Sequence, residues 1–551
     1  MKNLLKKDTR CLIIQSEFSA FSYWNYVDVC KMVGAKYPAS PLGLLTVAAL
    51  LPQQWEFKLV DANIEPVLDE HFEWADIVCV GGMLPQQASM LSLIERAHDF
   101  HLPVVAGGPD PTSQPELYQS VDYLVLGEGE VTIPLFIADL ENGCTRGQYQ
   151  SEEKADMRKA VVPRFDLIRF QDYLQIGIQY SRGCPFQCEF CNIVELFGRT
   201  PRAKTPEQIV RELQTLYDLG HRGHIDIVDD NFIGNKRNAK QTLTAIREWS
   251  EQNRYPFYFS TECSINLADD EDLMQLMQDV DFRYIFIGIE TPEDTALLMT
   301  NKSANVNRDI GDTMKRIYSH GMIVNAGFII GLDFESDQIA ENMIRCIRES
   351  GIAMAMLGML YALPETKLSR RLILEGRLFE DSSNLKKDPS MIDQTTDGLN
   401  FITNRPRLDI LKDYRRIEST IYNAENYFKR VTETACLLNR VPKHRPELIK
   451  RIKIGLTFLK LNWKLGTDRL TSWPYFKMMF IVLFKNPSGI ESAANLAAMF
   501  IHFHKQSEYI LKHVSTEIEA VESCLPDENP DKELTVHSVP KREFAEVPVD
   551  F

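Results

Sequence analysis

Strand-like and helix-like patterns alternate from residue 10 to residue 361 of this chain. Runs of β-branched residues separated by helical periodicity predict parallel sheets with helices on their faces, because parallel neighbours need a crossover connection. The first series predicts five strands, at Cys11–Ile14, Phe57–Asp61, Asp76–Val80, Pro103–Ala106 and Tyr123–Leu126. We therefore expect residues 10–142 to form an α/β domain that binds a ligand beyond the carboxyl ends of its strands.

A second series follows residues 143–172, which lack periodicity and are expected to be a connector. It predicts six strands, at Ile176–Tyr180, His224–Val228, Phe257–Thr261, Tyr284–Ile289, Ile323–Ile330 and Leu357–Tyr361. Six such units predict a full or partial parallel barrel over residues 173–400, with its chemistry at the carboxyl ends of the strands.

The remaining sequence is helical in pattern. Residues 401–525 are expected to be all-helical, with helices at Leu408–Asn426, Glu447–Leu461 and Ile490–Val514. Residues 526–551 carry several prolines and charges and are expected to be disordered.

Composition narrows the class of protein. The 551 residues include 61 basic and 77 acidic side chains, a net charge of −16, which argues against general nucleic-acid binding. Most of the 11 cysteines are isolated, as in proteins of a reducing cytoplasm. The apolar run Met478–Phe484 is too short to cross a bilayer, and no export signal is visible. We expect a cytoplasmic protein.

Small and polar residues follow successive strands of the first series. They are Asp61-Ala62-Asn63, Gly81-Gly82-Met83, Gly107-Gly108-Pro109 and Gly127-Glu128-Gly129-Glu130. Glycine lets a ligand approach the backbone closely, so these turns predict a ligand site, although an ordinary tight turn explains each one alone. No Gly-x-Gly-x-x-Gly opens the first helix, so a dinucleotide is not indicated.

Three cysteines, Cys184, Cys188 and Cys191, lie within eight residues directly after the first strand of the second series. No fourth cysteine or histidine nearby closes a tetrahedral zinc site. Three thiolates can hold three irons of a four-iron four-sulfur cluster and leave the fourth iron open to a substrate. The alternative is a zinc site completed by a distant residue such as Cys263.

This cysteine spacing, with Phe190 before the last cysteine, resembles the cluster loop of the radical S-adenosylmethionine superfamily. The resemblance continues over residues 175–370, with a motif at each strand end. It implies a 4Fe-4S cluster on the three cysteines and S-adenosylmethionine contacts from Phe190, Asp229, Asp230, Asn231, Ser260, Glu262, Glu290, Gly327 and Gly331. Helix capping by the aspartates and close packing at the glycines are the alternatives. Leu363-Pro-Glu-Thr366 departs from the superfamily's usual Pro-Gly-Thr-Pro form.

The first series resembles the Rossmann-like cobalamin-binding domain found in front of some of these barrels. The resemblance implies cobalamin contacts from Pro41, Leu42, Gly43, Asp61, Asn63, Gly81, Gly82, Met83, Gly107, Gly108, Pro109, Gly127 and Glu128. Asp69-Glu-His71 and Asp99-Phe-His101 match only half of the axial-histidine motif of other cobalamin proteins, and neither follows the first strand. The resemblance therefore implies a cobalamin without an axial histidine.

The segments Lys204-Thr-Pro-Glu207 and Val228-Asp-Asp-Asn-Phe-Ile-Gly-Asn235, followed by an all-helical part after residue 400, make the whole chain resemble relatives of the bacterial hopanoid methylases. This implies radical methyl transfer from cobalamin to an unactivated carbon of a small-molecule or lipid-like substrate, hopanoids being one candidate, with electrons from a reductase such as flavodoxin or ferredoxin. Two alternatives stay open. One is radical ring formation, carbon–carbon bond formation or oxidation without methyl transfer, and the other is a non-catalytic iron-sulfur or cobalamin sensor.

A basic and aromatic stretch bears on the substrate. It comprises Arg440–Arg445, Lys450–Lys453, Lys460, Trp463, Lys464, Trp473, Tyr475, Phe476 and the apolar run Met478–Phe484. This composition suits peripheral contact with an anionic membrane surface. A solvated helix face packed on the barrel is the alternative.

Overall fold

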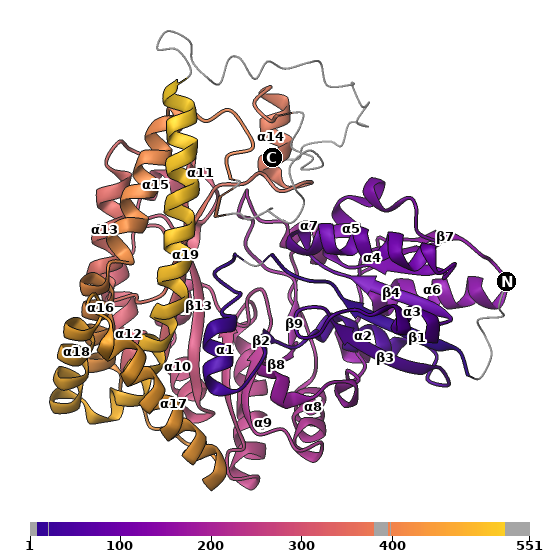
Figure 1. The fold of residues 1–551 in the computed structure, drawn as a ribbon, viewed down its shortest axis with the longest axis horizontal. Coiled ribbons are helices and arrows are strands. Elements are labelled where there is room, and N and C mark those ends of the chain that lie inside the picture. The colour runs from indigo at the N-terminus through magenta and orange to yellow at the C-terminus, as the bar shows by residue number, and fades with distance from the viewer. Residues whose placement is uncertain (1–7, 20, 380–394, 397, 524–551) are drawn as a thin grey trace.

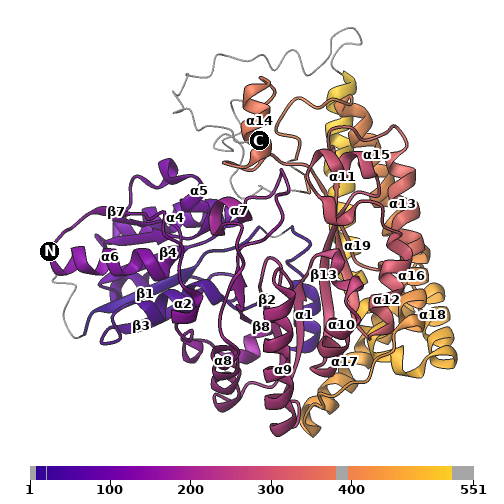
Figure 2. The ribbon, with the colours of Figure 1, turned by 180° about the vertical axis from the view of Figure 1, so that it is seen from behind.

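The computed structural model describes residues 8–379, 395–396 and 398–523, except for residue 20. The tail predicted to be disordered lies outside the described residues. Two parallel sheets follow each other along the chain, and helices of the C-terminal part pack beside the second (Figures 1 and 2). The expected class, α/β with a helical C-terminal region, is confirmed.

The first sheet has six parallel strands in the order β3-β1-β4-β5-β6-β7. Their bounds are Arg10–Gln15 (β1), Glu56–Asp61 (β3), Ile77–Gly81 (β4), Val104–Gly107 (β5), Tyr123–Val125 (β6) and Gly147–Tyr149 (β7). The five predicted strands are all present. The sixth, β7, lies in the predicted connector, which is otherwise irregular apart from short 3₁₀ turns.

Helices cover both faces of this sheet, which explains the nearly continuous apolar strands. Leu12 and Ile14 pack against α3 and α4, whereas Cys11 and Ile13 pack against α2 and α6. The helices span Leu42–Leu50 (α2), Asp69–Trp74 (α3), Gln87–Asp99 (α4), Pro109–Ser113 (α5) and Gly129–Glu141 (α6).

The second sheet has seven parallel strands in the order β15-β14-β13-β12-β11-β8-β2 and forms a half-barrel. Six of them match the predicted strands. Their bounds are Tyr173–Ile178 (β8), Gly223–Ile227 (β11), Phe257–Glu262 (β12), Phe282–Glu290 (β13), Ile323–Ile330 (β14) and Ala355–Met359 (β15). A full or partial barrel was expected, and the structure shows the partial one.

The seventh strand, β2 (Tyr37–Ala39), comes from the segment that we expected inside the first domain. Tyr37 pairs with Tyr173, and Ala39 pairs with Gln175, so β2 forms an edge of the half-barrel. The preceding helix α1 (Val27–Val33) contacts the C-terminal helices α17 and α19. A three-residue strand with proline at its centre carries no periodic signal, and proline is tolerated there because the strand is at an edge.

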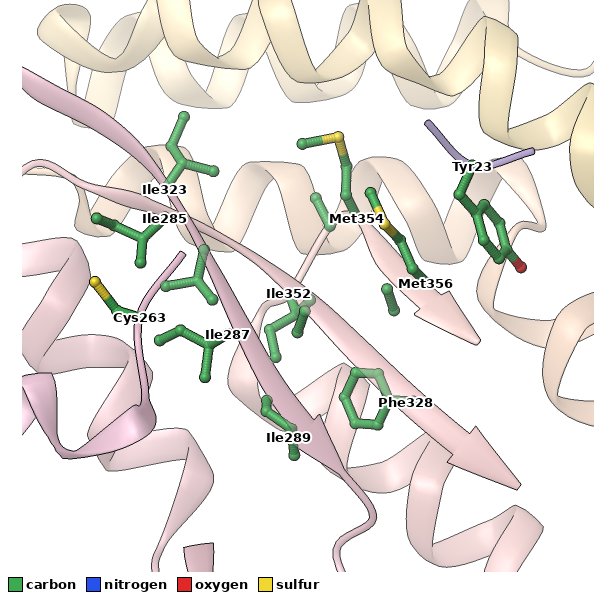
Figure 3. Packing of buried hydrophobic residues seen from close by; sticks show 14 of the residues in the cluster. Tyr23, Cys263, Ile285, Ile287, Ile289, Ile323, Phe328, Ile352, Met354 and Met356 are labelled. Carbon is green, nitrogen blue, oxygen red and sulfur yellow. The ribbon is translucent and has the colours of Figure 1, made fainter. Parts of the chain in front are cut away.

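Helices pack on the outer face of the half-barrel. Alternate residues of β13 divide between its two faces: Ile285, Ile287 and Ile289 are fully buried in the core, whereas Tyr284 and Phe286 line the interior (Figure 3). The covering helices are α8 (Pro206–Asp218), α9 (Lys236–Gln252), α10 (Glu271–Asp279), α12 (Ile310–Ser319) and α13 (Ile339–Ser350). Three further helices, α7 (Ile193–Phe197), α11 (Asp294–Met299) and α14 (Lys367–Leu374), follow β9, β13 and β15 along the chain. A short antiparallel pair, β9 (Ser181–Arg182) and β10 (Arg202–Ala203), flanks the cysteine loop.

Five helices form the C-terminal part. They are α15 (Arg407–Ile421), α16 (Ala424–Leu437), α17 (Leu448–Thr467), α18 (Ser472–Lys485) and α19 (Ile490–Ser523). The helix predicted at Leu408–Asn426 is present as α15, but its predicted end is wrong. The helix ends at Ile421, and Asn423, whose side chain accepts a hydrogen bond from Glu425 N, caps the start of α16. In the described ranges, no helix combines the length and hydropathy needed to cross a membrane.

Candidate active site

The three cysteines of the motif lie half-buried on the loop between β9 and α7. Gly183 begins this loop with φ +92°, and a Cβ there would stand 2.8 Å from Gly198 O, so the turn requires glycine. Glu189, within the loop, donates its N–H to Thr300 O at 2.9 Å, and its carbonyl oxygen accepts from Leu368 N at 2.9 Å. The loop is thus held from both sides, and its three soft thiol donors suit iron.

Cys263, the candidate fourth zinc ligand, belongs to the hydrophobic core rather than to this loop. It is buried in the same cluster as Ile285 and Ile287 (Figure 3). Among the described residues, no three His, Cys, Asp or Glu side chains form a group able to hold a single metal ion. Cys263 therefore packs as an apolar side chain in the core, which disfavours the zinc alternative.

A buried ion pair lies beside the cysteine loop. Lys302 Nζ is 2.7 Å from Glu290 Oε1, and Glu290 ends β13 with φ +65°, a conformation that a non-glycine residue rarely adopts. Burial raises the pKa of Cys188, and raises that of Cys191 to about 12, while the Lys302 charge opposes both shifts. Burial also lowers the pKa of Lys302, but Glu290 and the two thiols outweigh it and the net shift is upward. No sequence motif surrounds Lys302, so it was not predicted.

The three polar residues after β11, Asp229, Asp230 and Asn231, differ in their hydrogen-bond partners. Asp229 accepts hydrogen bonds from Tyr180 N and Ser181 N, both at 2.7 Å, so it fixes the chain entering the cysteine loop and caps no helix. Asp230 Oδ2 is buried and has no hydrogen-bond partner among the described residues. Asn231 Nδ2 lies 3.8 Å from Cys184 Sγ. Burial raises the pKa of Asp229 to about 7 and that of Asp230 to about 6.

A cavity of about 1780 Å³ fills the interior of the half-barrel. It extends from Glu262, at the carboxyl end of β12, to residues 445–461 before and within α17. Apolar side chains of β13, β15 and the segment before α1 line much of it, including Phe286, Met356 and Trp24. This volume exceeds that of ordinary small-molecule pockets, which are about 300–1,000 Å³.

Acidic groups gather at one end of the cavity. Burial raises the pKa of Glu262 to about 8, and the charges of Asp230, Asp226 and Asp229 contribute to the rise. Such crowding of carboxyl groups favours a cationic ligand, because a positive charge relieves their mutual repulsion.

Ser260 lies one layer deeper in the barrel than Glu262. Its hydroxyl donates to Asp226 and lies 2.8 Å from His224 Nε2. Burial lowers the pKa of His224 to about 3, so the imidazole is neutral. The hydroxyl of Ser260 is already engaged in this network, which the sequence did not indicate.

The two predicted glycines near the end of β14 are placed differently: Gly327 lies within the strand and Gly331 directly follows it. Gly327 lies opposite Gly288 on β13, and a Cβ at position 327 would stand 3.0 Å from Phe286 Cζ. The Phe286 ring therefore occupies the space that a side chain at position 327 would need. Gly331, with φ +92°, donates its N–H to Glu335 at 3.0 Å. Its contacts are with that carboxylate and Leu399.

Glycine turns at the carboxyl ends of β4 and β5 form a close backbone contact in the first sheet. Gly108 has φ +105°, and a Cβ there would stand 3.0 Å from both N and O of Gly82. A Cβ at Gly107 would stand 2.6 Å from Val125 O. Met83, next to these turns, is exposed. Glycine keeps this edge free of side-chain bulk, which suits a large planar ligand such as cobalamin.

Other predicted cobalamin contacts are engaged within the protein. Asp61 accepts from Asn63 N at 2.9 Å and from Tyr173 OH at 2.9 Å, and Asn63 Oδ1 accepts from Phe18 N. Glu128 forms buried ion pairs with Arg182 and Arg202 across the two sheets. These three side chains therefore hold the two α/β parts and their loops together.

The remaining predicted contacts surround the same edge. Pro41 caps α2, Leu42 begins it, and Gly43 has room for a side chain, with no described atom within 4 Å of a Cβ. Gly81 ends β4, Pro109 begins α5, and Gly127 has φ +76°. Phe190 packs against the main hydrophobic core beside the cysteines.

Family models match three parts of the chain. The B12 binding domain matches residues 32–137, the radical SAM superfamily matches residues 178–347, and a domain of unknown function matches residues 366–516. The order of the first two matches the order of the sheets. The fold and the cysteine loop thus define a cobalamin-binding radical S-adenosylmethionine enzyme.

Two curated relatives narrow the class. An uncharacterized methyltransferase of Synechocystis sp. is 38% identical over 517 residues, which cover 92% of this chain and 94% of the relative. The hopanoid C-2 methylase of Rhodopseudomonas palustris is 41% identical over 348 residues, covering 62% of this chain and 66% of the relative. This chain therefore belongs to the cobalamin-dependent radical S-adenosylmethionine methyltransferases. Its cofactors are a 4Fe-4S cluster, S-adenosylmethionine and cobalamin.

Solved structures share the fold at low sequence identity. The cobalamin-dependent S-adenosylmethionine radical enzyme OxsB superposes with a TM-score of 0.57 at 14% identity, covering 96% of this chain and 83% of OxsB. The radical S-adenosylmethionine methyltransferase TsrM from Kitasatospora setae has a TM-score of 0.58 at 14% identity, covering 75% of this chain and 89% of TsrM.

Proposed function

We propose that this enzyme methylates an unactivated carbon of a lipid-like substrate held in the half-barrel cavity. The size of the cavity carries the proposal, because its volume of about 1780 Å³ suits a long apolar molecule better than a small metabolite. The hopanoid C-2 methylase relative makes a polycyclic lipid the first substrate class to test.

Residue roles follow from the placement of the site. Cys184, Cys188 and Cys191 hold the cluster, and the glycine turns around Gly82 and Gly108 hold cobalamin at an edge that is free of side-chain bulk. When bound, the cluster and S-adenosylmethionine supply the radical that removes a hydrogen atom, and cobalamin supplies the methyl group.

The acidic end of the cavity selects the charge of the ligand. S-adenosylmethionine carries an ammonium and a sulfonium, and Asp230 presents an unpaired buried oxygen near Glu262. We assign these two carboxylates to the positive groups of S-adenosylmethionine. Asn231, which reaches Cys184, positions the cysteine loop.

The barrel wall controls where the reaction takes place. Phe286, Met356 and Trp24 exclude water and orient an apolar substrate below the acidic end. No side-chain acid or base is required for hydrogen abstraction, so the protein's task is to align the substrate carbon and keep competing groups away. Electrons come from a separate reductase such as flavodoxin or ferredoxin.

The test uses anaerobically reconstituted enzyme with cobalamin, a strong reductant and S-adenosylmethionine labelled in its methyl group. Deoxyadenosine and label are followed together in an extract of polycyclic lipid incubated with the enzyme. Label in the lipid is expected, and the Cys188→Ala variant should yield neither product. Deoxyadenosine without label in any lipid would overturn the proposed substrate class and favour radical chemistry without methyl transfer.

A further inference from the structure

Helix α17 carries apolar side chains on two sides. One side lines the cavity through Ile454, Phe458 and Leu461. The other side is exposed, and its members recur every three or four residues along one stripe: Leu448, Ile452, Leu456, Leu459 and Trp463. A helix on the surface of a protein needs one apolar stripe to pack, so packing leaves the second stripe unexplained.

Helix α18 repeats this arrangement. Tyr475, Met478 and Val482 are buried in the core. A second stripe is exposed and consists of Trp473, Phe476, Phe480, Leu483 and Phe484. The Phe476 ring lies against Gly466, where a Cβ would stand 2.7 Å from Cζ, and Gly466 is one turn from Trp463. The two stripes therefore meet, and we call them together the apolar face.

The side chains of the apolar face are far from burial. Trp463 is 74% exposed and Trp473 is 75% exposed, values that leave most of the indole in water. The two helices pack against each other at the same end of the molecule, and α18 also packs against α16 (Figures 1 and 2). Large aromatic side chains grouped in this way mark a surface that is covered by something apolar.

Basic residues are interspersed along the sequence with those of the apolar face, in a chain whose net charge is −16. Between residues 445 and 485 there are nine basic residues against two acidic ones, Glu447 and Asp468. The basic residues are Arg445, Lys450, Arg451, Lys453, Lys460, Lys464, Arg469, Lys477 and Lys485. Exposed lysines such as Lys460 and Lys464 next to exposed tryptophan, phenylalanine and leucine match an anionic lipid surface, with lysines at headgroups and rings at the acyl boundary.

The cavity reaches this same end of the molecule. Its lining includes Arg445, Lys450 and Lys453 of the basic stretch, together with Arg222 and Pro256, which precede strands β11 and β12. The inner side of α17 thus faces the cavity while its outer side carries the apolar face. A molecule that leaves a bilayer beside α17 has a short path into the half-barrel.

We propose that the apolar face of α17 and α18 docks on an anionic lipid bilayer, and that a lipid passes from the bilayer into the cavity beside α17. The passage of lipid rests on the proposed function, whereas docking does not. A second copy of the chain is less suited to cover the apolar face. A two-fold symmetric contact would bring the same basic side chains of both copies together, and these would repel each other. Protein interfaces are also depleted in lysine.

The test is flotation of the purified protein with vesicles of phosphatidylcholine alone and of phosphatidylcholine mixed with phosphatidylglycerol. We expect binding to the mixed vesicles that weakens at high salt. The Lys460→Gln/Lys464→Gln variant should bind about 30-fold more weakly, at about 1 kcal/mol for each lysine. The Trp463→Ser/Phe480→Ser variant should lose binding as well. Leu374→Ser is the matched control, because Leu374 is 88% exposed on α14 and outside the apolar face.

Several outcomes overturn docking. They are absence of wild-type binding to mixed vesicles, equal binding by the Trp463→Ser/Phe480→Ser variant, and wild-type dimers in sedimentation that this variant converts to monomers. Circular dichroism melting of each variant excludes misfolding as the cause. Vesicle binding without methylation of any lipid, in vesicles or in detergent, would leave docking in place and overturn the proposed function instead.

Discussion

Arg182 Nη1 lies 2.9 Å from Glu128 Oε2 between the two α/β parts, where the Glu128 side chain is buried and the Arg182 side chain is mostly buried. Arg202 pairs with the other oxygen of Glu128 at 2.8 Å, and Arg182 also pairs with Glu130 at 2.8 Å. Because Arg182 is two residues from Cys184, this network ties the cysteine loop to the sheet proposed to hold cobalamin.

Removing Glu128 should therefore destabilise the protein before it affects any cofactor. Glu128→Gln leaves the mostly buried Arg202 guanidinium without its anion and leaves Arg182 paired with Glu130 alone. The loss should not exceed about 3–5 kcal/mol, which is the cost of removing one partner of a fully buried pair. Urea unfolding of the cofactor-free variant measures this loss. Glu116→Gln is the control, since Glu116 is an acidic residue of the first part for which no ion pair is seen among the described residues. If unfolding is unchanged and cobalamin binding alone weakens, Glu128 contacts the cofactor and the network is not structural.

Gly108→Ala tests the glycine turns. Its φ of +105° and the 3.0 Å approach to Gly82 both disfavour a Cβ, so we expect a loss of about 1–3 kcal/mol of unfolding free energy and weaker cobalamin binding. Gly43→Ala is the matched change at the same edge, in open space on α2, and should be neutral or stabilising by up to about 1 kcal/mol. Cobalamin titration followed by absorbance measures binding. Equal behaviour of the two variants would contradict the proposed cradle.

Lys302→Met should weaken retention of the cluster. The change leaves Glu290 buried without its cation, at a cost of about 3–5 kcal/mol, and removes the positive charge beside Cys188 and Cys191. Iron content and absorbance after anaerobic reconstitution measure the effect. Lys302→Arg keeps the charge and should recover most of the iron. Full iron content in Lys302→Met would show that this charge plays no part in holding the cluster.

Glu418 should give the stability a pH dependence. Burial raises its pKa to about 7, while hydrogen bonds from Tyr23 and Ser507 oppose the rise. The folded state therefore binds a proton that the unfolded state has released between about pH 4.5 and pH 7, so unfolding free energy falls as pH rises through this window. When the pKa of a group differs by one between the folded and unfolded states, the difference corresponds to about 1.4 kcal/mol.

The Glu418→Gln variant removes this titration. Compared with the wild type, it should lose less unfolding free energy between pH 5 and pH 8, by a few kcal/mol. Urea unfolding at the two pH values measures the difference. Tyr23 OH, 2.5 Å from Glu418 Oε1, can still donate to the amide oxygen, so the variant retains this bond. Parallel curves for the two proteins would show that Glu418 is ionised when folded.

Sequence patterns predicted the two sheets because each long strand carries its own local signal. Ile323–Ile330 was predicted with its observed bounds, since eight mostly apolar residues between a Gly-Met pair and a Gly-Leu-Asp turn leave little choice. Tyr37–Ala39 was missed, because its place is decided by pairing with β8. A strand of three residues has too few positions for a pattern.

The sequence predicted only those site residues that belong to a local motif. The cysteines were found because all three are close in sequence. Lys302 and Asp226 were not found, since the fold brings them to the site from outside any motif. Asp61 and Asn63 were expected to face a ligand, but a sequence does not show which way a side chain points, and both are bonded within the protein.

Strand β2 has a consequence for synthesis of the chain. Tyr37–Ala39 leaves the ribosome early, yet its partner β8 begins only at Tyr173, after the whole first sheet has been made. Strand β2 must therefore remain unpaired while the first sheet folds, until β8 has been synthesised. For the same reason, a truncated gene that starts at the connector would yield a half-barrel with β8 as a bare edge, open to pairing with other chains.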